Sequence, residues 1–393
     1  MKTPPKPPAR KIAIVTFASA FNYGAILQAF GLQSALKRLG VKADLVDYSN
    51  PHIAWVYAPV KRSGLFFGGF FASLVHVWNA ILAAARNSRF RRFIARHLSL
   101  TRRRFYLSDD LNVLNARYDA FIAGSDQVFG LRCTNFDTAY FLSFVADPAK
   151  KFSYAASFGF DQVPAPYRKV YSALLSDFAA LSVREESGRA ILHSLLGPDV
   201  PVQVHVDPTL LLSPDDWRAV AATSRRRLPR RYILVYNVQP PERLFEEALR
   251  LSDRLRIPVL YLGFEPFWVH RIFRRRVHLR YVAGPEDFLA AFANADYVLT
   301  NSFHGTVFSC LFRRRFAVEL ENKRMFNFRV QALLAQFNLA DRAFSSADLL
   351  ETLEKPVDWD AFERLRQAEC ARSESYLRSI AKGTPSPAAT ATP

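Results

Sequence analysis

The chain has 393 residues, enough for two ordinary domains or one large domain. Lysine and arginine total 53 against 35 acidic residues, a formal net charge of +18, which favours anionic partners such as phosphorylated small molecules, anionic lipid or nucleic acid. The three cysteines, Cys133, Cys310 and Cys370, stand far apart without CxxC or other metal-type spacing, so neither a disulfide framework nor a structural zinc site is expected.

Both ends of the chain are low in complexity. Residues 1–10 are proline-rich and basic without the apolar stretch of a signal peptide, and residues 384–393 form a tail of small residues and proline. We expect both ends to be disordered. The missing signal peptide and the unpaired cysteines favour a cytoplasmic location.

The first half of the chain, residues 11–223, alternates apolar runs with amphipathic stretches. The run at 11–17 predicts a strand, and the helical periodicity of 25–40 predicts a helix that stops at Gly40. Further strands are expected at 42–48, 118–124, 151–159, 179–185 and 204–212. This alternation is typical of a parallel sheet that is covered on both faces.

An insertion at about 52–106 interrupts this first domain. Residues 65–85 contain no acidic residue, lysine or arginine, and their length would just span a bilayer. Residues 86–105, which follow, alternate arginines with aromatic and aliphatic residues. Three interpretations stay open: a segment lying in the bilayer interface against anionic head groups at the inner face of the membrane, ordinary buried helices, or a true span.

A basic stretch broken by proline, residues 224–231, predicts a linker, after which the strand–helix alternation restarts. The second domain is expected at 232–350, and a helical region at 351–383 is expected to pack back onto the first domain. Strands are predicted at 232–238, 257–264, 296–301 and 316–320, and helices at 241–256, 285–295 and 305–314. The predicted fold is α/β, with two Rossmann-like doubly wound domains facing across a cleft.

Small and polar residues collect after the strands of both halves, where such sheets bind ligands. In the first half they are Asn22, Gly24, Gly124, Ser125, Asp126, Gln127, Ser157 and Arg184, and in the second half Asn301, Ser302, His304 and Gly305. Glycine lets the backbone approach a ligand, and the start of a helix favours an anion. We predict that these residues line the site.

Several sequence blocks in this order resemble the polysaccharide pyruvyl transferases, over about residues 12–342. The blocks are FNYGAILQAFGLQSAL, FIAGSDQVF, FSYAASFG, LSVREESG, VDPTLLLSPDDW, NADYVLTNSFHGTVFS and, more weakly, NFRVQALLAQFNLADR. The resemblance implies a fold like that of GT-B glycosyltransferases. It also implies transfer of a pyruvyl unit from phosphoenolpyruvate to a sugar of a cell-surface polysaccharide or its lipid-linked precursor, usually as a ketal bridging two hydroxyls.

That chemistry suits two of the residues. Phosphoenolpyruvate must be protonated at its methylene carbon, for which a histidine serves near neutral pH, so His304 is the candidate acid/base or leaving-group stabiliser. The donor's carboxylate and phosphate need a fixed cation, for which Arg184 is the candidate. Arg329, in the weakest block, is a further candidate donor ligand. We expect no cofactor, no metal and no nucleic-acid partner.

Each of these residues also has a structural explanation. His304 could cap the helix that follows it, Arg184 could pair with Glu185, and Asn22 could cap the helix after the first strand. Asp126 could bind an acceptor hydroxyl or hold its own turn. Family members commonly continue the GSDQ block with tryptophan and asparagine, where this chain has Phe129 and Gly130, so the acceptor's identity is open.

Two other functions stay open. A GT-B glycosyltransferase would use a nucleotide-sugar and would place an acidic residue late in the second domain, where Glu319 and Glu321 stand. A non-catalytic member would organise polysaccharide assembly instead.

Overall fold

The computed structural model describes residues 10–58, 70–238, 242–263, 277–279, 282–320, 324–344 and 349–384. The predicted disordered ends, apart from residues 10 and 384, and residues 65–69 of the apolar segment lie outside this part. The internal contacts divide the chain into two compact units. The first unit consists of residues up to 56, 97–211 and 368 onward, and the second of residues 57–96 and 212–367.

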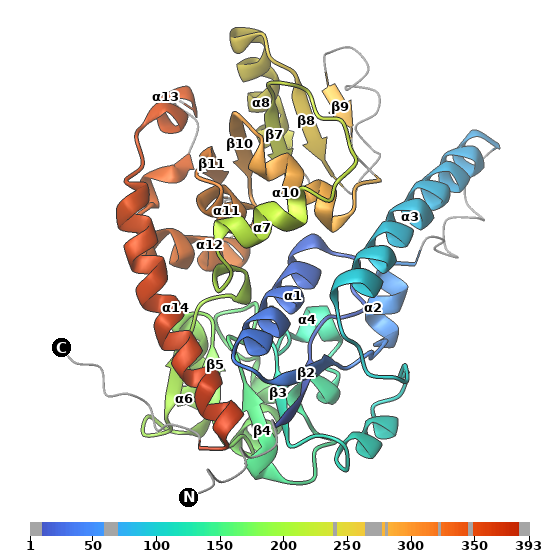
Figure 1. Cartoon of the computed structure of the whole chain (residues 1–393), viewed down its shortest axis with the longest axis vertical. Coiled ribbons are helices and arrows are strands. Elements are labelled where there is room, and N and C mark those ends of the chain that lie inside the picture. Colours follow the sequence, from blue (N-terminus) through green and yellow to red (C-terminus); the bar gives the residue numbers. More distant parts are fainter. Residues whose placement is uncertain are drawn as a thin grey trace, which may run out of the picture. The chain divides into compact units, whose positions relative to one another are not determined.

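The first unit is built on a parallel sheet in the order β2-β1-β3-β4 (Figure 1). Its strands are β1 (Lys11–Val15), β2 (Lys42–Leu45), β3 (Ala120–Ala123) and β4 (Lys151–Ser153). A further parallel pair, β5 (Leu181–Val183) and β6 (Val202–Val204), is joined to the sheet by two bridges, from Phe152 of β4 to Ala180 and from Ala156 after β4 to Val183. All residues of β3 and β4 are buried, as expected of a sheet covered on both faces.

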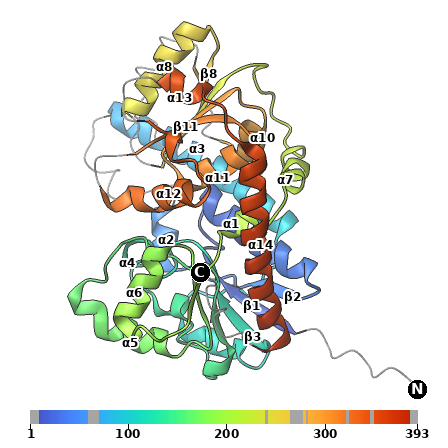
Figure 2. The same ribbon diagram turned by 90° about the vertical axis from the view of Figure 1, so that its left-hand side faces the viewer.

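Helices connect these strands. They are α1 (Tyr23–Arg38), α2 (Pro51–Val56), α4 (Leu131–Thr134), α5 (Arg168–Ser176) and α6 (Glu186–Leu196). Figure 2 shows α5 and α6 side by side. Short 3₁₀ turns lie at Asp109–Leu114, Thr138–Phe141, Pro148–Lys150, Ala165–Tyr167 and Pro208–Leu210. Gly31 lets α1 approach the last of these turns, because a Cβ there would lie 2.5 Å from the Pro208 carbonyl oxygen.

The second unit has a parallel sheet in the order β12-β11-β10-β7-β8-β9 (Figure 1). Its strands are β7 (Ile233–Tyr236), β8 (Val259–Leu262), β9 (Val277–Leu279), β10 (Tyr297–Thr300), β11 (Arg315–Glu319) and β12 (Ala343–Phe344). In chain order this is the 3-2-1-4-5-6 arrangement of a Rossmann fold.

Helices cover both faces of this sheet. On one face, α8 (Glu242–Leu255) and α13 (Leu349–Glu354) bury their apolar side chains in one cluster with Val235 and Leu299 of the strands. On the other face, Tyr236 contacts Phe288 of α10 (Pro285–Ala293), which in turn contacts Phe308 of α11 (Phe303–Leu311). The remaining elements are α7 (Pro214–Ala221), α12 (Arg324–Gln336) and a 3₁₀ turn at Ala340–Arg342.

The boundary between the units differs from the predicted linker at 224–231. From residue 212 the chain already packs with the second unit, because the ring of Trp217 on α7 lies 5.1 Å, edge to face, from that of Phe308 on α11. Ser224, inside the predicted linker, donates a hydrogen bond to Asp287 of α10 (2.7 Å). Residues 212–231 are therefore part of the second unit's packing.

Most of the insertion belongs to another unit than the one predicted from the sequence. Its helix α3 (Phe70–His97) lies in the first half of the sequence, but residues 57–96 belong to the second unit. Arg89 and Arg96 of α3 pair with the first turn of α10, at 3.5 Å from Asp287 and 3.8 Å from Glu286. These ion pairs give two arginines of the insertion a partner inside the protein. In the described part of the chain no helix combines the length and apolar character that a membrane crossing needs.

The chain ends in α14 (Trp359–Lys382), a single long helix in Figure 2, whose residues from Ala368 on belong to the first unit. There the hydroxyl of Tyr376 donates to the carbonyl oxygen of Ser153 in β4 (2.8 Å). The rings of Tyr376, the buried His205 and Tyr154 contact one another in one cluster. Burial, followed by the charge of Arg372, lowers the pKa of His205 to about 3, so this imidazole is a neutral part of the core.

Candidate functional site

The first unit gathers its predicted site residues at the carboxyl ends of β1, β3, β4 and β5. The strand order reverses between β1 and β3, the position at which doubly wound sheets bind ligands. Helix α1 leaves β1 on one side of this point, and the GSDQ block leaves β3 on the other. The predicted residues of this unit thus share one edge of one sheet.

Arg184, directly after β5, is the centre of a buried ion cluster at this edge. Its Nη1 lies 2.8 Å from Asp207 Oδ2, and its Nε lies 3.1 Å from Glu185 Oε1. Asp126 Oδ1 lies 3.9 Å from Nη1. Although burial alone would lower the pKa of Arg184, these three carboxylates raise it above its usual value. One guanidinium thus faces three carboxylates.

Hydroxyl groups complete the cluster on its inner side. Ser125 donates to Asp207 (3.2 Å), and Ser157 donates to Glu185 (2.9 Å). The other oxygen of Asp207 accepts from the amide and the hydroxyl of Thr209 (3.0 and 2.7 Å). In this structure Ser125 and Ser157 therefore serve as hydrogen-bond donors to buried carboxylates.

Asp126 is the most accessible carboxylate of the cluster. Its side chain is 14 % exposed, against 0 % for Asp207 and 4 % for Glu185. Its backbone is left-handed, with φ of 69°, and Ala155 beside it has φ of 47°. Non-glycine residues in this conformation are uncommon and gather at functional sites. The backbone is thus bent at the point where an acidic group reaches the surface.

The other predicted residues of this edge have local structural partners. Asn22 caps α1, because its Oδ1 accepts from the amide of Ala25 (3.2 Å). Gly124 is close to the Thr16 side chain, 3.0 Å from the position a Cβ would take. Gln127 packs on Gly159, which has φ of 73° and no room for a Cβ. Gly24 is buried in the first turn of α1.

The second unit places His304 at the corresponding point of its own sheet. The strand order reverses between β7 and β10, and the block NSFHG follows β10 directly. Ser302 caps α11 by accepting from the amide of Gly305 (3.3 Å), so His304 is the second residue of the helix. Its side chain is 7 % exposed, and its ring lies edge to face with that of Phe303, 5.2 Å away.

Gly305 allows this first turn to sit on the sheet. A Cβ at this position would lie 2.3 Å from Thr300 Oγ1 and 3.1 Å from the Tyr236 ring. Thr300 in turn donates to the carbonyl oxygen of Tyr236 (2.6 Å) and accepts from the amide of Ser302 (3.1 Å). The hydroxyls and the glycine together hold the start of α11 against β7 and β10.

Two further predicted residues belong to this unit. The Oδ1 of Asn301 accepts from the amide of Val238 (3.0 Å), which ties the end of β10 to the end of β7. Arg329 lies half-buried on α12. No group of three or more metal-ligating side chains occurs in the described ranges.

Asp207 follows β6 in VDPTLLL, among the polar residues that the sequence places after the strands of this half. Because a proline follows it, the sequence favoured a structural role over a place in the site. The sequence feature that indicates the pairing is that the blocks VREE and VDP each follow a strand of the same unit. Opposite charges at neighbouring strand ends then predict the pair between Arg184 and Asp207.

Comparison with known proteins bears on the whole chain. The family model described as polysaccharide pyruvyl transferase matches residues 22–318. No protein of curated function matches the sequence.

Two solved structures are similar over nearly their full lengths. A putative UDP-N-acetylglucosamine 2-epimerase from Listeria monocytogenes has 12 % identity and a TM-score of 0.54, covering 98 % of this chain and 100 % of its own. A second UDP-N-acetylglucosamine 2-epimerase has 12 % identity and a TM-score of 0.53, with 98 % and 99 % covered. At this identity the likeness concerns the fold alone, which is GT-B-like with two Rossmann-type units.

Proposed function

The chain belongs to the polysaccharide pyruvyl transferase family, and from this membership we propose that it transfers a pyruvyl group from phosphoenolpyruvate to hydroxyls of a sugar. The acceptor is a cell-surface polysaccharide or its lipid-linked precursor, and the product is a ketal. The observation that carries the proposal is the position of His304, in a block that the family model covers and at the switch point of the second unit's sheet.

The anionic donor fits the start of α11. The first amides of a helix have no partner within the helix and attract anions, and α11 begins at Phe303 beside His304. The residues that hold this turn are hydroxyls and a glycine, and none of them brings a negative charge. We therefore assign the phosphate of the donor to this helix start and the proton transfer to His304.

The proposed reaction is balanced without a redox cofactor or a metal. A proton adds to the methylene carbon of phosphoenolpyruvate and leaves an oxocarbenium-like centre at C2, which a sugar hydroxyl attacks with loss of its own proton. The C2–O bond to phosphate breaks, and a second hydroxyl attacks C2 and closes the ketal, its proton leaving with the phosphate. The net products are one ketal and one inorganic phosphate.

The acceptor hydroxyls fit the edge of the first unit. Asp126 supplies an accessible carboxylate that can accept a hydrogen bond from a hydroxyl or take its proton. Arg184 is paired with Asp207 and Glu185, so we assign it to positioning this carboxylate group. This differs from the sequence-based hypothesis, in which Arg184 is the free cation for the donor.

The test is incubation of the purified chain with phosphoenolpyruvate and a panel of lipid-linked and aryl glycosides. We expect release of phosphate and, by mass spectrometry, a product heavier by pyruvate minus water. The same chain with Asp126→Asn should keep its affinity for phosphoenolpyruvate and lose transfer. If no acceptor gives a product, the proposed transfer is refuted, and a non-catalytic role in polysaccharide assembly is the interpretation that remains.

A nucleotide-sugar transferase is the second candidate, because Glu319 is buried at the end of β11, next to β10. Glu321 lies outside the described residues. Saturable binding of UDP together with no binding of phosphoenolpyruvate would select this candidate.

We further propose that α3 meets an anionic membrane surface. Val77, Trp78 and Ile81 are 51 %, 61 % and 54 % exposed on this helix, and Arg91 and Arg92 are exposed further along it. Sedimentation with anionic vesicles should fall with added salt and with Trp78→Ser. Equal sedimentation of the Trp78→Ser variant and the unchanged chain would contradict this proposed contact.

A further inference from the structure

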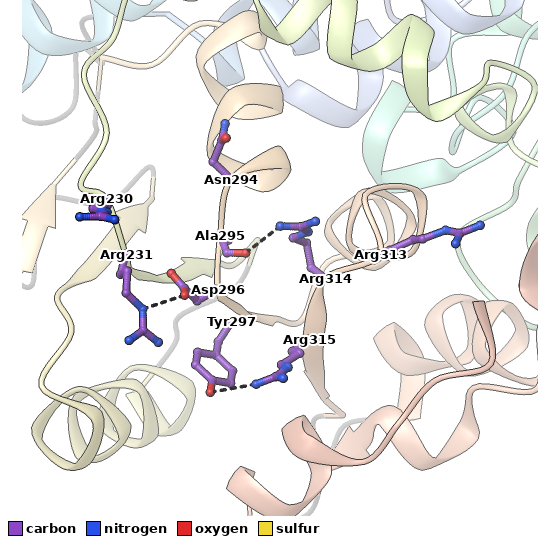
Figure 3. A pocket seen from close by; sticks show the side chains of 9 residues that line it. All are labelled: Arg230, Arg231, Asn294, Ala295, Asp296, Tyr297, Arg313, Arg314 and Arg315. Atoms are coloured by element: carbon purple, nitrogen blue, oxygen red, sulfur yellow. Dashed lines mark hydrogen bonds and ion pairs between the residues drawn. The ribbon is translucent and has the colours of Figure 1, made fainter. Parts of the chain in front are cut away.

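A cavity of about 400 Å³ lies in the second unit at the amino-terminal ends of β10 and β11 (Figure 3). Tyr297 and Arg315, which pair across these strands, line it. His304 follows the opposite, carboxyl-terminal end of β10. The cavity is therefore at the other edge of the sheet from the proposed donor site. We call it the arginine pocket, because five of its lining residues are Arg230, Arg231, Arg313, Arg314 and Arg315.

Three of these arginines have carboxylate partners. Arg231 lies 3.0 Å from Asp296, which also lines the pocket. Arg315 lies 3.0 Å from Glu354. Arg313 lies 3.6 Å from Asp360, and Figure 3 shows it pointing away from Arg314. These pairs leave the positive charges of the other two arginines unbalanced.

The guanidinium group of Arg314 is held by two backbone carbonyl oxygens. Its Nε donates to the carbonyl oxygen of Phe312 (2.7 Å) and its Nη1 to that of Ala295 (3.3 Å; Figure 3). Burial, followed by the charge of Arg218, lowers the pKa of Arg314, and the opposing charge of Asp296 does not cancel this effect. Arg230 has no ion pair among the described residues. Arg314 and Arg230 thus bring two positive charges to the same cavity.

The backbone turn after α11 fixes the position of two arginines in the pocket. Arg313, which follows the C-cap residue of α11, is left-handed, with φ of 53°, a conformation that glycine usually takes at this position. Two backbone bonds fix this turn, from the amide of Arg313 to the Cys310 carbonyl (2.9 Å) and from that of Arg314 to the Ser309 carbonyl (2.8 Å). The turn brings Arg314 and Arg315 into the lining of the pocket.

We propose that the arginine pocket binds a phosphate-bearing anion at a site separate from the proposed donor site. A guanidinium group can donate two parallel hydrogen bonds to the oxygens of one phosphate. The volume of the cavity admits a phosphate or pyrophosphate group with its substituent. The phosphate could belong to a free metabolite or to a lipid head group.

The first experiment measures the affinity for inorganic pyrophosphate by calorimetry at low salt. Arg230→Glu should weaken binding about tenfold, the loss expected for one charge-assisted contact. The matched control is Arg250→Glu on α8, which changes the net charge equally at a site 71 % exposed; it should change the affinity less than about twofold. Arg314→Lys keeps the charge but loses the planar fork, so binding should weaken while the melting temperature stays near that of the unchanged chain.

The second experiment distinguishes the source of the phosphate. Vesicles containing phosphatidic acid should bind less well to Arg230→Glu than to the control if the ligand is a head group, and pyrophosphate should compete. Binding of pyrophosphate without any effect on vesicles assigns a free phosphate. Equal affinities of the control and both pocket variants, or no binding of pyrophosphate at all, would overturn the proposal. Neither experiment uses the transfer reaction, so their outcome is independent of the proposed function.

Discussion

The carboxyl-terminal sheet edges of the two units carry opposite chemistry. In the first unit a buried arginine is surrounded by Asp207, Glu185 and Asp126. In the second unit the start of α11 is held by Ser302, Thr300 and a glycine, with His304 as the titratable group. One edge has an excess of carboxylates, and the other has neutral partners around a helix start.

This difference indicates which ligand each edge suits. A dianionic donor is repelled by an excess of carboxylates and attracted by the start of a helix. A sugar offers hydroxyl protons, which carboxylates accept well. A buried arginine at a sheet edge thus does not have to bind the anion, because the carboxylates paired with it decide whether its charge is available.

The largest effect should come from His304→Gln, which keeps the size of the side chain and removes its acid/base function. Transfer should fall by about 10²–10⁴-fold, the range for loss of a general acid or base, with the melting temperature little changed. Phosphate release in a single turnover measures the effect. His193→Gln on α6 is the control, and comparable losses in both variants would contradict the assigned role of the second edge.

Arg184→Met tests the first edge. It leaves Asp207 and Glu185 buried without their cation, so the free energy of unfolding should fall by about 3 kcal/mol or more. Urea denaturation measures this, and Asp207→Asn in the same chain should restore part of the loss. A free donor clamp would behave differently: the KM for phosphoenolpyruvate would rise and the stability would stay constant.

The core behind the first edge should respond to acid through His205. Its pKa is lowered to about 3 in the folded chain, while the unfolded chain takes up a proton near pH 6.5. Because the unfolded state binds the proton first, stability should fall as the pH drops from about 6.5 toward 3, by about 2 kcal/mol between pH 7 and 5. In His205→Gln this part of the pH dependence of the urea midpoint should disappear, and an unchanged pH dependence would refute it.

The smallest effect is expected from Asn22→Ala at the start of α1. Loss of the cap should cost about 1 kcal/mol of stability, and Asn22→Ser should recover most of it. Transfer should stay constant in both. A rise in KM without a loss of stability would instead make Asn22 a ligand and extend the binding surface of the first edge.

Much of the fold follows from local patterns in the sequence. Short apolar runs that end in small or polar residues predicted β1, β7 and β10, and helical periodicity predicted α1, because these signals depend on neighbouring residues. The family blocks also placed His304 at a strand end. Its position in the first turn of α11 then follows from the cap at Ser302.

Contacts between distant residues could not be predicted in this way. Arg89 and Asp287 are 198 positions apart, and nothing near either residue indicates that α3 pairs with α10. Arg184 and Asp207 are closer, 23 positions apart, but their pairing depends on the neighbouring ends of β5 and β6. The insertion and the role of Arg184 are for this reason the two points at which the structure changes the interpretation.

The packing of the last helix has a consequence for synthesis on the ribosome. Tyr376, Leu377 and Ile380 are buried in the unit that begins with the first strand. That unit cannot complete its core until Ile380 has emerged, after the whole of the second unit, so the usual order in which an amino-terminal domain matures first is closed to this protein. Its nascent amino-terminal half is the part with the greatest need of a chaperone.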